Sequence, residues 1–397
     1  MQEGVKMSRL LALLSGKGGS GKTTLALSMS SLLANCGIKV LLVDCDLSTN
    51  GATYFYEKKL SNETNKKIIS IEEICKNEIS NSFELNVKEN LYFIPSITSI
   101  NQDNNSSYLN GLLQDNAVKK YFLEARQRYD IIIFDCQAGY TVLLDSILKL
   151  TDCNLVVMEA DAISSASVRS LYLKIGNIIN NKSSFQIFNK VTKDEDEIYS
   201  KISGGTFFTN IGTIIFDWKV RKSFAIATIP DMENTSADYG EKVFELCSIL
   251  FSEKEYEEYL CTFKDKLEYH RNVEMLKNLE NDWNELKLIR KNTYSNRFSK
   301  YLILPTLITM MLALVTATFY ESDINLFFES KILATLLVLL LTVAMCLFML
   351  LELTSEKRIN RRNKEVLLEK IEITNANIMN IKTKIESNNN KTKYLKF

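Results

Sequence analysis

Histidine is almost absent from this chain of 397 residues. The one histidine, His270, lies in a charged stretch, and without a second imidazole a histidine-based metal set cannot be completed. The eight cysteines form no C-x-x-C pair and lie mostly within apolar runs, which favours reduced, buried thiols. These shortages argue against a zinc enzyme and against a disulfide-stapled secreted domain.

Net charge is also missing, because 48 Lys and Arg residues balance 48 Asp and Glu residues. A zero sum gives no general attraction to nucleic acid or to acidic partners, although local patches can persist. The first residues lack a charged segment followed by an apolar segment and a cleavage site, so no signal peptide is expected. The length suits one large domain with added modules, or two domains.

A glycine-rich loop follows the first apolar run of the chain. Its residues fit the phosphate-binding pattern G-x-x-x-x-G-K-[ST], between a predicted strand at residues 10–14 and a predicted helix. Glycines allow successive backbone N–H groups to face phosphate oxygens. Lys22 would reach the β- and γ-phosphates, and the Thr23 hydroxyl would ligate Mg²⁺. The nucleotide contacts predicted in this loop are Gly16, Lys17, Gly18, Gly19, Ser20, Gly21, Lys22, Thr23 and Thr24.

Strands and helices alternate over the first 250 residues or so. This rhythm predicts an α/β fold, a twisted and mainly parallel sheet with helices on both faces. The predicted strands are residues 10–14, 40–43, 91–94, 131–134, 155–158, 185–188 and 211–215. Ligands of such sheets bind at the carboxyl ends of the strands, which is where polar residues gather in this sequence.

Three aspartates mark two of these strand ends. Asp44 and Asp46 follow the second predicted strand, and Asp135 ends a later strand that runs into Gly139. Carboxylates there can hold Mg²⁺ through its waters and orient a water that attacks the γ-phosphate. A lone aspartate after a strand is often a helix cap or turn residue, but three downstream of a phosphate-binding loop favour a functional site.

Six segments, in this order, resemble the ParA/MinD family of deviant Walker A ATPases: KGGSGKTT, VLLVDCDLSTNGAT, YDIIIFDCQAG, LVVMEADAISSASV, FQIFNKV and IGTIIFDWKVRKSFA. The resemblance covers residues 8–252 and implies a P-loop fold and two ATP-bound subunits facing each other. It implies that Lys22 serves its own phosphates while Lys17 reaches the nucleotide of the other subunit. One departure is Gln137, which stands where the family usually has proline.

The resemblance also implies roles for residues outside the loop. Asp46 falls where the family's aspartate orients the hydrolytic water, and Asp44 would support the metal shell. Asp135 falls on the Walker B aspartate, and Gly139 on the segment that senses the γ-phosphate. Asn189 falls on the asparagine that meets the adenine edge. The metal set implied in this way is Thr23, Asp44 and Asp135, and the catalytic set is Lys17, Lys22 and Asp46.

Two uncharged apolar stretches, residues 301–320 and 332–351, lie in the last third of the chain. As helices rising about 1.5 Å per residue, each would cross roughly 30 Å, the core of one bilayer. The connector, residues 321–331, is acidic, whereas basic residues precede the first stretch and follow the second. The positive-inside rule therefore predicts a two-span protein of the cytoplasmic membrane with both termini in the cytoplasm. A hydrophobic core hairpin is the alternative.

Charged segments with sparse apolar stripes flank this hairpin, at residues 253–300 and 352–397. Steps of three and four predict helices that form a coiled-coil stalk, paired either within the chain or with another subunit. The stripes comprise Leu276, Leu279, Trp283 and Leu286, then Leu367, Ile371, Ile378, Ile381 and Ile385. The predicted organisation is thus an ATPase domain at residues 1–252, a stalk, two spans, and a cytoplasmic helix and tail.

These features predict a membrane-anchored homodimer that hydrolyses ATP to ADP and phosphate with Mg²⁺ and positions, recruits or gates an unidentified protein partner. A P-loop tyrosine autokinase of the exopolysaccharide type is one alternative, but its spans precede the ATPase domain and its tail is rich in tyrosine, whereas this tail offers only Tyr394. A non-hydrolysing ATP-binding scaffold is another. A membrane DNA tether is a third, although Lys219, Arg221 and Lys222 make only a small basic patch.

Overall fold

The chain forms two compact units, Met1–Arg271 and Asn272–Phe397, which are described separately. The computed structural model describes residues 8–63, 67–79, 82–97, 113–200, 207–231, 235–253, 256–261, 263–288, 366 and 368–386.

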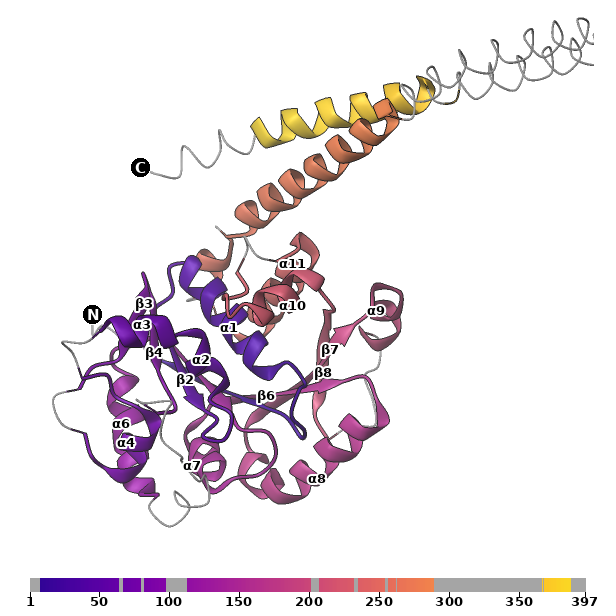
Figure 1. Cartoon of the computed structure of the whole chain (residues 1–397). Coiled ribbons are helices and arrows are strands. Elements are labelled where there is room, and N and C mark those ends of the chain that lie inside the picture. Colours follow the sequence, from indigo (N-terminus) through magenta and orange to yellow (C-terminus); the bar gives the residue numbers. More distant parts are fainter. Residues whose placement is uncertain are drawn as a thin grey trace, which may run out of the picture. The chain divides into compact units, whose positions relative to one another are not determined.

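An eight-stranded sheet forms the centre of the first unit (Figure 1). The strand order is β3-β4-β2-β5-β1-β6-β7-β8, and every neighbouring pair is parallel except β3 and β4. The strands are β1 Arg9–Leu14, β2 Val40–Cys45, β3 Leu85–Lys88, β4 Leu91–Ile94, β5 Ile131–Cys136, β6 Cys153–Glu159, β7 Ser183–Val191 and β8 Thr209–Ile215. The mainly parallel α/β sheet predicted from the sequence is confirmed.

Strand β3 was not predicted. It has only four residues and pairs antiparallel with β4 across a two-residue turn. Asn90, the second turn residue, has a φ of 60°, a left-handed conformation that asparagine tolerates better than most residues. The strand is too short for its alternation to be recognised against the surrounding polar residues.

Helices cover both faces of the sheet (Figure 1). They are α1 Lys22–Asn35, α2 Gly51–Phe55, α3 Glu57–Asn62, α4 Ile71–Lys76, α6 Asp115–Ala125, α7 Val142–Leu150, α8 Ala162–Ile179, α9 Lys193–Ser200, α10 Trp218–Ala225 and α11 Ala237–Leu250. Alternate residues of β1 enter two different cores: Leu11 and Leu13 pack with α1 and α11, whereas Leu10 and Leu14 pack with α4, α6, α7 and α8. Burial on both faces explains why these strands read as continuous apolar runs.

The first unit extends further than the predicted boundary at residue 252. Tyr256, Leu260, Phe263 and Leu267 are all buried in the core that also contains α1 and α11. Their helical segment therefore belongs to the compact unit that ends at Arg271. Because the exposed face of this segment is charged, its sequence pattern resembles that of the stalk that follows it.

In the second unit, residues 272–288 and 368–386 are helical. The residues of the apolar stripes are among the less exposed of their helices: Leu276, Leu279, Trp283 and Leu286 are partly buried, and Ile371, Ile378 and Ile381 are buried. Lys382 Nζ lies 3.3 Å from a carboxylate oxygen of Glu280, so the two helices run side by side. Helices at these positions agree with the sequence pattern, and their role as a stalk remains a prediction.

The predicted spans at residues 301–320 and 332–351 lie outside the described residues, as do their connector, Leu367 and Tyr394. Among the helices of the described ranges, none combines the length and the apolar character needed to cross a membrane.

Candidate nucleotide-binding site

The glycine-rich loop, residues 15–21, joins β1 to α1 and lies between α8 and the side chain of Asn189. Gly19 and Gly21 have φ values of 82° and 87°, which glycine adopts without strain. A Cβ on Gly16 would lie 2.4 Å from the carbonyl carbon of Ser167 in α8, and one on Gly21 would lie 2.2 Å from Asn189 Nδ2. Glycine is therefore required at Gly16 by the backbone of α8 and at Gly21 by its left-handed conformation. By contrast, nothing described lies within 4 Å of a Cβ on Gly18.

Lys22, the first residue of α1, is paired with Asp135 at the end of β5. The Lys22 Nζ to Asp135 Oδ1 distance is 3.1 Å, and both side chains are buried, with 6% and 0% exposure. Burial alone would lower the pKa of Lys22, but the charge of Asp135 and its hydrogen bond outweigh burial and raise this pKa. The buried Oδ2 atom of Asp135 accepts no hydrogen bond from the described residues. The pair thus offers one fixed ammonium and one unsatisfied carboxylate oxygen.

Asp44 lies directly beside Asp135, since the two are paired residues of the neighbouring strands β2 and β5. It accepts hydrogen bonds from the backbone N–H and the hydroxyl of Thr53, both at 2.7 Å, and from the Asp46 N–H at 3.0 Å. Burial, and then the negative charge of Asp135, raises the pKa of Asp44 to about 7. This carboxyl group therefore carries a proton over part of the neutral range in the absence of a bound cation.

The raised pKa of Asp44 predicts a pH dependence of stability. Between its ordinary value of 3.8 and about 7, folded Asp44 retains a proton that the unfolded chain releases. The free energy of unfolding should therefore fall as the pH rises through this window, and Asp44→Asn should remove that fall. Denaturant unfolding of the two chains between pH 5 and 8 measures the slope.

Asp46 supplies the control for this experiment. Burial alone would raise its pKa, but hydrogen bonds from Thr49 and Ser48 outweigh burial and lower it. Asp46 therefore does not titrate between pH 5 and 8, and Asp46→Asn should keep the slope of the unsubstituted chain. Equal slopes in all three chains would contradict the assignment to Asp44.

Both carboxylate oxygens of Asp46 are engaged in the turn that follows β2. Oδ1 accepts from the Ser48 N–H and hydroxyl and from the Thr49 N–H, and Oδ2 accepts from the Thr49 hydroxyl at 2.7 Å. The same segment continues into α2, where a Cβ on Gly51 would lie 3.3 Å from the Thr23 hydroxyl oxygen. The segment after β2 thus lies against the start of α1.

Three further predicted residues, Gly139, Ser20 and Thr24, lie in the loop or next to it. The N–H of Gly139 donates to the carbonyl oxygen of Ser15 at 2.8 Å, and Gly139 has a φ of 78°. Ser20 is buried, and the carbonyl oxygen of Thr24 accepts a hydrogen bond from Ser28 within α1. The segment after β5, which contains Gln137, is therefore tied to the phosphate-binding loop through the backbone.

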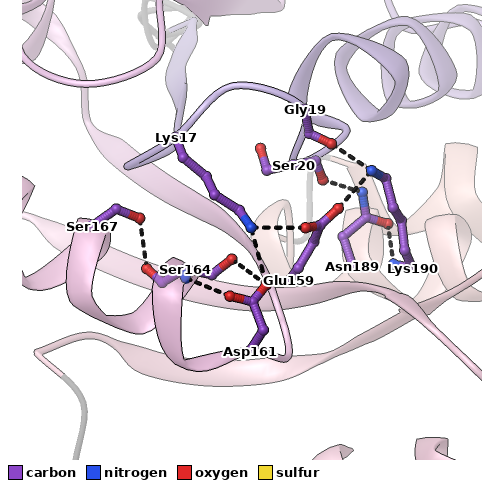
Figure 2. A network of polar contacts seen from close by, with 9 residues as sticks. All are labelled: Lys17, Gly19, Ser20, Glu159, Asp161, Ser164, Ser167, Asn189 and Lys190. Carbon is purple, nitrogen blue, oxygen red and sulfur yellow. Dashed lines mark hydrogen bonds and ion pairs between the residues drawn. The ribbon is translucent and has the colours of Figure 1, made fainter.

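Lys17 forms ion pairs within its own subunit (Figure 2). Its Nζ lies 3.0 Å from Glu159 Oε2, at the end of β6, and 3.0 Å from Asp161 Oδ2, at the start of α8. Hydrogen bonds to Asp161 and Glu159 raise the pKa of Lys17. The Lys17 side chain is 30% exposed to solvent, so it remains accessible from outside the subunit.

Asn189, predicted to meet an adenine, contacts the loop backbone. Its Nδ2 donates to the Ser20 carbonyl oxygen at 2.8 Å (Figure 2). The next residue, Lys190, donates from Nζ to the Gly19 carbonyl oxygen and lies 2.6 Å from Glu159 Oε1. Glu159, Asp161 and Lys190 were not predicted, although Glu159 ends β6, Asp161 follows it and Lys190 is the last residue but one of β7, positions from which a role in the site could have been suspected.

The structure therefore brings Lys22, Asp44, Asp46 and Asp135 together at the ends of β2 and β5, whereas Lys17 contacts Glu159 and Asp161, and Asn189 contacts the backbone of the loop. Over the described ranges, no group of three or more His, Cys, Asp or Glu residues is placed to hold a metal by itself. Phosphate oxygens and water would have to supply some of the ligands of a cation at this site, which is the usual arrangement for Mg²⁺.

Comparison with known proteins finds a matching family model and two similar curated proteins. The family model described as an AAA domain matches residues 8–187. An uncharacterized protein of Methanocaldococcus jannaschii is 27% identical over 163 residues, 40% of this chain and 62% of the relative. The sporulation initiation inhibitor protein Soj of Bacillus subtilis is 24% identical over 155 residues, 39% and 60% of the two chains. The matches thus span about three fifths of these curated relatives.

Two solved structures share the fold. A plasmid partition protein of Borrelia burgdorferi B31 bound to AMPPNP has a TM-score of 0.50 at 24% identity, covering 62% of this chain and 99% of its own. The septum site-determining protein MinD of Pyrococcus horikoshii, complexed with Mg-ADP, has a TM-score of 0.50 at 18% identity, covering 64% and 99%. The similarity to Soj and these two folds support the resemblance to ParA and MinD, and the first unit has the P-loop NTPase fold.

Proposed function

We propose that the first unit binds ATP with Mg²⁺ and hydrolyses it to ADP and phosphate. The buried pair of Lys22 and Asp135 carries this proposal. An ammonium at a helix N-terminus beside a glycine-rich loop suits phosphate, and the Asp135 oxygen without a partner suits a cation or its waters. A purely structural salt bridge would leave no reason for that buried oxygen to be unsatisfied.

The residues present fit both groups. Loop N–H groups and Lys22 would hold the phosphates, and Asp135, Thr23 and Asp44 would surround Mg²⁺ directly or through water. When bound, Mg²⁺ supplies neutralisation of phosphate charge. Asp46 would orient water once the hydrogen bonds from Ser48 and Thr49 are rearranged, because both of its oxygens are occupied in the described state.

We further propose that ATP switches self-association, with Lys17 serving the nucleotide of a second subunit. The resemblance supports this role, and so does the position of Lys17 beside the loop with its side chain partly exposed. Two proteins with this fold, a plasmid partition protein and a septum site-determining protein, support a function in positioning a partner assembly. The predicted membrane hairpin would anchor this switch permanently in the cytoplasmic membrane, with both termini in the cytoplasm.

Helix α10 favours a second candidate, a membrane DNA tether. Trp218 has 68% of its surface exposed, and the Arg221 guanidinium lies 5.0 Å from the centre of its ring. Exposed aromatic and basic side chains together suit stacking on bases and contact with phosphates. Salt-dependent binding of DNA to the purified chain, lost in Arg221→Ala and Lys222→Ala, distinguishes this tether from a switch that does not contact nucleic acid.

The mass of the purified chain in solution, with Mg-ATP and with Mg-ADP, tests the proposed switch. Asp46→Ala should slow hydrolysis and leave ATP bound long enough to observe. We expect self-association with Mg-ATP only, and its loss when Lys17→Ala is added. Equal association with Mg-ATP and with Mg-ADP would contradict the proposed switch. Association that persists in the Lys17→Ala chain would contradict the role of Lys17 in a second subunit.

A further inference from the structure

Four side chains beside the loop form a chain of ion pairs, here named the Lys17 clasp, in the order Asp161, Lys17, Glu159 and Lys190 (Figure 2). Its two ammonium groups and two carboxylates balance in charge. Glu159 lies at the centre, because one oxygen lies 3.0 Å from Lys17 Nζ and the other 2.6 Å from Lys190 Nζ. The clasp joins the ends of three elements, since β6, β7 and α8 each supply a member.

Asp161 is fixed independently of Lys17. It caps α8, and its Oδ1 accepts the Ser164 N–H at 2.7 Å while its Oδ2 accepts the Ser164 hydroxyl at 2.8 Å. The hydrogen bonds from Ser164, and then that from Lys17, hold the pKa of Asp161 well below its usual range. The carboxylate is thus charged and already in position, and Lys17 adds a third interaction to it.

Lys190 connects the clasp to the phosphate-binding loop. Its ammonium donates to the carbonyl oxygen of Gly19, and its backbone φ is 60°, a left-handed conformation that is costly for a residue with a Cβ. The surrounding contacts must offset that cost. The clasp therefore binds a carbonyl oxygen of the loop at the same time as it holds Lys17.

We propose that Glu159 and Asp161 are positioning residues for Lys17 that retain its ammonium in its own subunit. The lysine reaches a second subunit only when the phosphates bound there compete successfully with these two carboxylates. The clasp thereby sets the protein concentration at which ATP drives self-association. This inference rests on the proposed role of Lys17 in a second subunit.

Reaction of the lysines with an amine-reactive ester, followed by mass spectrometry, tests the retention of Lys17 without any nucleotide. Only the unprotonated amine reacts, so removing both carboxylates should speed labelling of Lys17. We expect Glu159→Gln with Asp161→Asn to raise its rate at least about threefold, which corresponds to about half a pKa unit. Asparagine is as good a helix cap as aspartate, so α8 should be preserved.

Asp145→Asn provides the matched control. Asp145 pairs with Lys149 at 2.8 Å within α7, outside the loop. This change should speed labelling of Lys149 and leave Lys17 unchanged. If Lys17 reacts at the same rate in the unsubstituted chain and in the Glu159→Gln, Asp161→Asn chain, the clasp does not hold the lysine and the inference is wrong.

The second measurement is the protein concentration at half-maximal association with Mg-ATP, in full-length chains carrying Asp46→Ala. Loss of both carboxylates should lower it by about threefold to tenfold, and adding Lys17→Ala should abolish association. An unchanged midpoint, with Lys17→Ala still abolishing association, overturns the clasp and keeps the proposed switch. Association that persists in Lys17→Ala overturns the switch itself, and the inference with it.

Discussion

Lys22→Met is expected to lower the free energy of unfolding by about 3–5 kcal/mol, in addition to abolishing nucleotide binding. The substitution removes the only cation that contacts Asp135 in the described part of the chain, and Asp135 has no exposed surface. A buried carboxylate without its partner is more costly than the loss of one hydrogen bond, because no water reaches it. Denaturant unfolding followed by circular dichroism measures the change.

The double substitution Lys22→Met with Asp135→Asn separates stability from binding. It removes both charges together, so most of the lost stability should return, whereas binding of a fluorescent ATP analogue should stay absent. Equal instability of the single and double variants would show that the charge on Asp135 is not the cause. Recovery of nucleotide binding in the double variant would show that Lys22 does not bind the phosphates.

Gly16→Ala is expected to destabilise the chain by about 1–3 kcal/mol or more and to weaken ATP binding. The added methyl would lie 2.4 Å from the carbonyl carbon of Ser167 and 2.6 Å from the Val168 nitrogen, which are backbone atoms of α8. A side chain could rotate away, but a helix backbone has to move as a whole. Thermal unfolding and titration with the fluorescent ATP analogue report the two effects.

Gly18→Ala is the matched control, two residues further along the same loop. Nothing described lies within 4 Å of a Cβ there, so stability should change by no more than about 0.5 kcal/mol. The comparison holds the chemistry constant and changes only the space around the methyl group. Similar melting temperatures for the two variants would contradict the close packing of α8 against the loop.

The fold was largely predictable because its strands are buried on both faces. Runs such as 131–134 and 155–158 are continuously apolar, and β5 and β6 contain them. The short strand β3 was missed because four residues are too few to show a pattern, and the segment that begins at Tyr256 was predicted as helix but assigned to the stalk because most of its residues are polar. Burial of a few residues such as Tyr256 and Phe263 depends on what packs over them, which local periodicity does not reveal.

The loop and its aspartates were also predictable, since glycine spacing and strand ends are local features. The partners of the polar groups were not. Lys17 and Asp161 are 144 residues apart, and Lys22 and Asp135 are 113 apart. Such pairs depend on which strands become neighbours in the sheet. The ParA/MinD resemblance implied a role for Lys17 in a second subunit, but it did not predict the contacts of Lys17 within its own subunit.

Helix α8 touches the loop at two separated points, and this gives it a mechanical property. Its first turn is capped by Asp161, which holds Lys17, and its backbone at Ser167 lies against Gly16. The helix has 18 residues, about 27 Å of stiff rod. Any movement of α8 as a rigid body, such as a tilt at its far end near Ile179, would therefore displace both Gly16 and Lys17.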